Sequence, residues 1–287
     1  MTTTWFMQSR GRLSHQDYSW APAMTPGTGG LSPEDLLAQG CGGRSISDII
    51  DDTKSCLLLY TLRERPDRNQ VWILLMTGLH PTATAEIDHM NRDIRVSVLG
   101  AGMGPVPPGE LAATACLFLT GGLQNGVPVS YGLRDDKAFA VDSEAWAEVI
   151  AGATQLEVPP ADEVPRPNTV SLDTDSPANR QWAAGMIVYL TSRVAIGDFS
   201  GKARLVGTEA RPFLVVTSLL GAESLRILMP LCGLSERVTG RELAHVSKER
   251  GWNVVRALTG KSVTFGLAVY AVLTVLAAIG TMIMLLL

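Results

Sequence analysis

The run SCLLLYTL at Ser55–Leu62 and the run VWILLMTGL at Val71–Leu79 decide the fold of this chain. Both runs are short and almost wholly apolar, and a charged segment that contains Pro66 separates them. Continuous apolar runs of this length are typical of strands that are buried on both faces. We therefore expect a strand pair in the interior of a sheet.

Capped helices and a half-buried strand surround this pair. Ser32 suits an N-cap, Pro33 suits the first helical position, and Gly40 suits the end of that helix. Apolar and polar residues alternate over Ile94–Leu99, which predicts a strand with one buried face. Helices are predicted at Thr82–Asn91, Glu110–Leu119 and Ser143–Ala151. Residues 32–156 should therefore form an α+β domain.

Residues 1–31 show neither a helical nor a strand period, and we interpret them as an extended arm. Its large aromatic side chains should dock the arm either on its own body or on a neighbouring subunit. Together with an aromatic residue of the C-terminal half, they are the candidates for self-association: Trp5, Phe6, Trp20 and Trp182.

Residues 157–178 contain five prolines and five acidic residues, which predicts an exposed linker. Beyond it, Ser176-Pro177 should cap a helix that runs to about Ile196, and Thr208 should cap another that runs through Leu220. Residues 179–261 are therefore predicted to form a helical domain. The predicted fold class is an α+β N-terminal body, an all-helical section and a C-terminal transmembrane helix.

Residues 262–287 contain no charged residue and no proline. As a helix they would extend about 39 Å, which is enough to cross a hydrocarbon core of about 30 Å. Basic residues precede this tail, so the body is expected on the cytosolic side or on the internal side of an enveloped particle. The alternative is a tail buried in a protein assembly. The residues that mark the anchor are Ser262, Phe265, Leu276 and Leu287.

Composition argues against several classes of function. The formal net charge of −4 leaves no basic excess, so general binding of nucleic acid is not expected. The four cysteines are widely spaced, which favours buried thiols over a disulfide framework or a zinc site. A cluster of acidic residues and histidines is interpreted as a solvated helix face rather than a metal site: His80, Glu86, Asp88, His89 and Asp93. No cofactor is predicted.

Gly100, Gly102 and Gly104 follow a predicted strand and precede a predicted helix, as the glycines of a nucleotide-binding loop do. Position 105 is proline, however, and Pro107 and Pro108 delay the helix. We therefore interpret these glycines as a turn, and keep them only as weak candidates for cofactor binding.

These patterns favour a non-catalytic, membrane-anchored structural or assembly protein. Its partners would be a lipid bilayer and further copies of itself, through the arm and the helical section. One alternative is a virion structural protein, a coat or matrix, whose tail packs on lipid or neighbouring subunits. The other is a membrane-bound enzyme that binds a nucleotide at Gly100–Gly104.

Overall fold

The computed structural model describes residues 3–24, 32–41, 45–51, 54–62, 70–82, 87–104, 106–123, 126–132, 138–161, 169–195, 213–221, 224, 232–236 and 253–256. The predicted tail at 262–287, with all four anchor residues, lies outside these ranges, as does Thr208. Among the described residues, no helix combines the length and the apolarity that crossing a bilayer requires.

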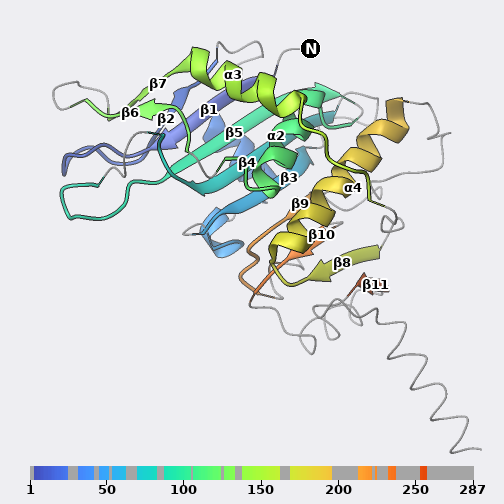
Figure 1. Ribbon diagram of the computed structural model, residues 1–287. Helices are drawn as coiled ribbons and strands as arrows, with labels where there is room; N and C mark the ends of the chain where they lie inside the picture. The colour runs from blue at the N-terminus through green and yellow to red at the C-terminus, as the bar shows by residue number, and fades with distance from the viewer. Residues whose placement is uncertain are drawn as a thin grey trace, which may run out of the picture.

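The described strands form one large mixed sheet of nine strands, in the order β11-β8-β10-β9-β3-β4-β5-β1-β2 (Figure 1). Strands β11, β8, β10 and β9 run parallel, whereas β9, β3, β4, β5, β1 and β2 pair antiparallel. Their bounds are β1 Thr4–Ser9, β2 Ser19–Pro22, β3 Cys56–Leu62, β4 Gln70–Leu79, β5 Val96–Gly104, β8 Thr169–Asp173, β9 Phe213–Val216, β10 Cys232–Leu234 and β11 Asn253–Arg256. Strands β6 (Val129–Ser130) and β7 (Ala140–Val141) pair separately.

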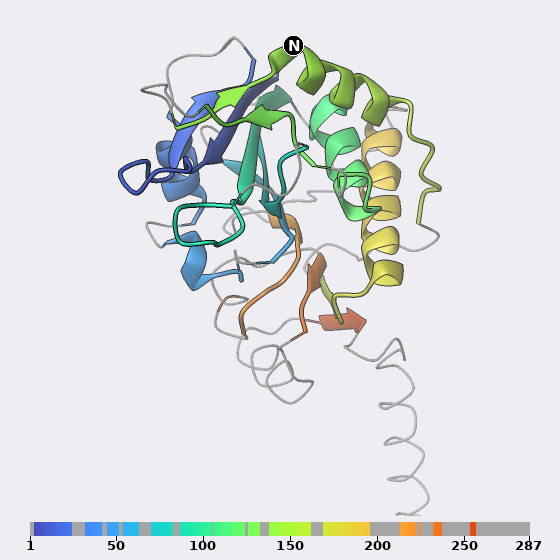
Figure 2. The same cartoon turned by 60° about the vertical axis from the view of Figure 1, so that its left-hand side comes forward.

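Helices cover both faces of the sheet. On one face lie α2 (Gly109–Leu119), α3 (Ser143–Thr154) and α4 (Pro177–Ala195), which stand together in Figure 2. On the other lie α1 (Pro33–Gly40) and the short 3₁₀ helix η1 (Ile46–Asp48). Side chains of a strand alternate between faces, so the sheet separates two apolar cores.

The α+β fold and its central strand pair are confirmed. Strands β3 and β4 pair along their length, and all seven residues of β3 are buried. The predicted caps also form: the Ser32 hydroxyl accepts a hydrogen bond from the Asp35 amide at 3.1 Å, and that of Ser176 accepts one from the Asn179 amide at 3.3 Å. Helices α1 and α4 therefore begin where their serine caps and prolines predicted, and α2 and α3 begin at Gly109 and Ser143, within one residue of the predicted starts.

The N-terminal arm proves to be part of the sheet. Strand β1 pairs with both β2 and β5, and Trp5 is fully buried in its own body. Trp5 and Met7 enter one core, whereas Phe6 packs against the other. The sequence TWFMQS has only three consecutive apolar residues, too few for the apolar run that marked β3 and β4, and it does not alternate either.

The structure also corrects the predictions of an all-helical section at 179–261 and of an exposed linker at 157–178. Strands β9, β10 and β11 lie within residues 179–261, and β8 lies within the predicted linker. The sequence FLVV of β9 is too short for periodicity to distinguish a strand from a helix, which explains the wrong helix through Leu220. Ala161 is buried, and its amide donates to the Gly185 carbonyl at 3.0 Å, so this part of the linker is packed against α4.

Candidate functional site

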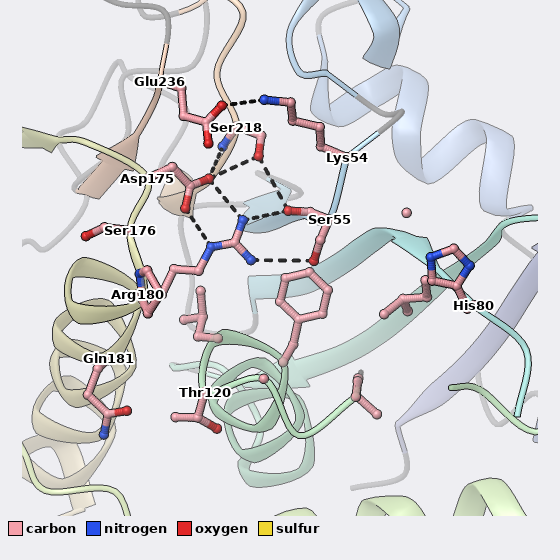
Figure 3. Close-up of a pocket in the computed structure, with 17 residues that line it drawn as sticks. Lys54, Ser55, His80, Thr120, Asp175, Ser176, Arg180, Gln181, Ser218 and Glu236 are labelled. Carbon is pink, nitrogen blue, oxygen red and sulfur yellow. Dashed lines mark hydrogen bonds and ion pairs between the residues drawn. The ribbon is translucent and has the colours of Figure 1, made fainter. Parts of the chain in front are cut away.

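A cleft of about 580 Å³ opens at the edge of the sheet where the parallel strands β8, β9 and β10 end (Figure 3). Strand β4 ends at the same edge and β3 begins there, because both run antiparallel within the sheet. The end of α2 and the first turns of α4 complete the walls. In open sheets, ligands bind outside the carboxyl ends of the parallel strands. This cleft is therefore the candidate site of the described structure.

A charged pair stands at the centre of the cleft. Asp175 lies between β8 and α4, and Arg180 lies in α4. The Arg180 Nε donates to Asp175 Oδ1 at 2.6 Å, and Nη2 donates to Oδ2 at 3.0 Å. The side chains are only 5% and 19% exposed. Because this two-point contact fixes a planar guanidinium, the pair is a rigid part of the wall rather than a mobile surface contact.

Ser218 ties this pair to strand β9. Its amide and its hydroxyl donate to Asp175 Oδ2 at 3.1 and 3.0 Å. Ser218 has a φ of +53°, the left-handed region, which costs about 1 kcal/mol or more for a residue with a side chain. Strained residues of this kind gather at functional sites, where the surrounding contacts hold them in place.

The Ser55 carbonyl accepts from Arg180 Nη2 at 2.7 Å and so joins the start of β3 to the same network. Asp175 thus accepts four hydrogen bonds, from Arg180 and from Ser218. With both oxygens engaged, Asp175 positions its neighbours and is poorly placed to act as a general base.

A second ion pair joins Lys54 to Glu236 at the rim. These side chains are 44% and 59% exposed, so solvent screens their attraction. Beneath the rim, the Cys56 thiol donates to the Asp51 carbonyl at 2.8 Å. Burial raises the pKa of Cys56 to about 11, against a smaller lowering by its hydrogen bonds with Ser218 and Thr77. Cys56 is therefore a structural thiol and not a nucleophile at neutral pH.

The predicted glycines do not form a loop. Gly100, Gly102 and Gly104 lie in β5, between β4 and β1. A Cβ on Gly100 would stand 2.5 Å from a Leu111 methyl and 2.6 Å from the Trp5 ring, so glycine is needed there for helix α2 to approach the sheet. These glycines serve packing, and the nucleotide loop of the enzyme alternative is not present at this position.

The predicted acidic cluster is not a helix face. In its described part, residues 87–93 form a turn closed by a bridge between Ile87 and Asp93. The buried Asp88 carboxylate accepts from Arg92 Nε at 2.9 Å and pairs with Arg10 Nη1 at 3.1 Å. Burial raises the pKa of Asp88, but hydrogen bonds from Arg92 and Met90 outweigh it and hold the pKa well below its usual range.

The other predicted residues are dispersed. Of the acidic and histidine cluster, His80 lies at the cleft, and Glu86 lies outside the described residues. Nowhere in the described ranges do acidic, histidine or cysteine residues gather as a metal site would need. Trp182 is partly buried against the larger core. All four cysteines are buried and in no disulfide, as predicted.

The residues that build the site were not predicted as a site. Asp175 and Arg180 lie only five residues apart, but Ser218 lies 43 residues beyond Asp175, and only the fold brings it to them. The one local signal was an acid directly before the Ser176-Pro177 cap, at the junction of a strand and a helix. Comparison with protein-family models, with curated proteins and with solved structures finds no match for this chain.

Proposed function

We propose that this chain is a membrane-anchored binding protein whose water-facing body takes a small polar molecule into the cleft. The observation that carries the proposal is the cleft itself, with its rigid Asp175–Arg180 pair at the carboxyl edge of parallel strands. A volume of about 580 Å³ lies in the range of small-molecule sites. The engaged carboxylate of Asp175 and the protonated Cys56 favour binding over catalysis.

The binding role is tested by blocking the cleft. Gln181 lines the cleft from an exposed position in α4, and Gln155 is an exposed residue away from it. The full chain in mild detergent is screened for thermal stabilisation by a library of amino acids, sugars, nucleotides and carboxylic acids. We expect stabilisation by one class, lost in Gln181→Trp and kept in Gln155→Trp. If no class stabilises the protein, or if both variants respond like the parent, the binding role is refuted.

The anchor is supported by sequence, since residues 262–287 are uncharged and follow basic residues at 248–261. We expect the full chain to stay in the membrane pellet after alkaline carbonate extraction. Deletion of residues 262–287 should move the protein to the supernatant. Release of the full chain by carbonate would contradict insertion into lipid and favour a tail that packs in a protein assembly.

Self-association is a second candidate role. The strand register places Phe6, Trp20 and Met103 on the face of the sheet that also carries α1 and η1; Phe6 and Trp20 are partly buried there, and Met103 is 38% exposed. An apolar face of this kind suits contact between copies, as the coat or matrix alternative would also require. Met103→Lys should reduce the molar mass measured by light scattering, whereas Tyr18→Lys, in a loop outside this face, should not. A parent protein that is already monomeric contradicts this role.

A further inference from the structure

One wall of the cleft offers a hydrogen-bond donor that its own neighbours engage only weakly. A guanidinium has five N–H groups, and Asp175 and the Ser55 carbonyl take three of those of Arg180. Among the described residues, the N–H groups of Nη1 meet only the Ser55 hydroxyl, at 3.4 Å, which is longer than an ordinary hydrogen bond. Arg180 is held in place by its other contacts, so this edge is a fixed cationic donor at the cleft.

The opposite wall offers unused acceptors. Helix α2 ends at the cleft, where Gly121 and Gly122 donate to the carbonyls of Phe118 and Leu117 at 3.0 and 2.8 Å. No hydrogen bond in the described part of the chain uses the carbonyls of Leu119 and Thr120. The last turn of α2 also carries no basic side chain. The end of this helix therefore presents partial negative charge that no cation of its own last turn offsets.

Both walls border the same cleft, since Arg180, Leu119 and Thr120 all line it. The guanidinium carbon of Arg180 lies 5.9 Å from the centre of the Phe118 ring, a cation–π contact that places Arg180 beside the last turn of α2. Formal charges along the lining balance, since Lys54 and Arg180 oppose Asp175 and Glu236. A multiply charged phosphate would find no excess of cations here, whereas a molecule with one positive and one negative end would meet both walls.

We infer that the cleft binds a small zwitterion of the α-amino-acid class. Its carboxylate accepts from Arg180 Nη1, and its ammonium donates to the carbonyls of Leu119 and Thr120. This assignment rests on the proposed binding role of the cleft and adds the chemical class of the ligand.

The test uses two charge changes in the cleft walls. Gln181→Glu adds a negative charge, with almost no change of shape, one residue from Arg180. Thr120→Lys adds a positive charge at the end of α2, where a cation also suits the helix. Calorimetric titration of the full chain with individual amino acids identifies the best zwitterion. Its analogues without the ammonium and without the carboxylate serve as single-charge controls.

We expect each variant to weaken binding of the zwitterion by about tenfold, because each brings a like charge close to one end of the ligand. Each single-charge analogue should bind more weakly than the zwitterion. If Thr120→Lys does not fold, as judged by circular dichroism, Gln181→Glu and the analogues still decide the assignment. Unchanged affinity in the folded variants overturns it.

The experiment distinguishes a wrong ligand class from a wrong binding role for the cleft. One outcome is that inorganic phosphate or a nucleotide binds the parent protein, binds Thr120→Lys more tightly than the parent, and fails to bind Gln181→Trp. In that case the cleft is a ligand site and the zwitterion assignment is overturned. If nothing binds that Gln181→Trp can block, both the assignment and the binding role are overturned.

Discussion

Removing the carboxylate of Asp175 should destabilise the protein far more than removing that of Glu236, although both belong to ion pairs of one cleft. Asp175→Ala deletes four hydrogen-bond contacts and leaves Arg180, only 19% exposed, without its counter-charge. Breaking a buried pair by removing one partner costs about 3–5 kcal/mol. Because Arg180 keeps some contact with water, we expect the lower end, about 3 kcal/mol.

Glu236→Ala is the matched control, since it removes a carboxylate whose side chain is 59% exposed. Exposed pairs contribute at most about 1 kcal/mol, so the free energy of unfolding should change by about 0.5 kcal/mol. The assay is urea unfolding of the full chain in detergent, followed by the fluorescence of buried tryptophans such as Trp5, with the slope of the transition checked for constancy.

The double variant Asp175→Ala with Arg180→Met separates a lost charge pair from a general loss of packing. Removing both charges leaves no buried cation, so the double variant should be more stable than Asp175→Ala alone. Equal decreases in the free energy of unfolding for Asp175→Ala and Glu236→Ala would refute the network that we describe. A double variant less stable than Asp175→Ala would also refute it.

Three further predictions concern other parts of the fold. Gly100→Ala should lower the free energy of unfolding by about 1–3 kcal/mol, because the added methyl group overpacks the core. Gly152→Ala, with open space around it in α3, should raise it by about 0.8 kcal/mol, because alanine favours a helix more than glycine does. Thermal unfolding measures both changes. Asp88→Ala should speed hydrogen exchange at the two amides that its carboxylate accepts, and unchanged protection there would contradict its role in the turn. The free energy of unfolding should fall as the pH rises above about 9. In the unfolded chain the thiols of Cys56 and Cys116 ionise near that pH, whereas burial raises their pKa in the folded chain to about 11 and about 12. Urea midpoints that stay constant from about pH 8 to about 10.5 would contradict the burial of these thiols.

Local chemistry predicted the elements whose signals are local. The caps at Ser32 and Ser176 mark the starts of α1 and α4, and two uninterrupted apolar runs mark β3 and β4. Strand β1 was missed because its apolar run, Trp5 to Met7, is only three residues long and is flanked by polar residues. Gly100 was misinterpreted because a glycine that makes room for a helix looks, in sequence, like one that makes a turn.

The candidate site depended on information that no single segment carries. Asp175 and Ser218 lie far apart in sequence and meet only because β8 and β9 end at one edge of the sheet. Neither the parallel pairing of β8 with β10 nor the place of β10 between β8 and β9 follows from periodicity. The only sequence signal at Asp175 was its position as an acid between a strand and a helix cap. That signal did not indicate which residues would contact its carboxylate.

The junction between β3 and β9 has a consequence for biosynthesis. Strands β3, β4 and β5 come from neighbouring segments, so this part of the sheet can form while the ribosome is still translating the chain. The other partner of β3 is β9, which begins roughly 150 residues after β3 ends. At about 5–20 residues per second, the strand CLLLYTL, which is buried along its whole length in the native fold, therefore waits roughly eight to thirty seconds for its neighbour. During that interval a nascent chain presents an open strand to every other nascent chain nearby, and slower translation of residues 63–212 should increase co-translational aggregation.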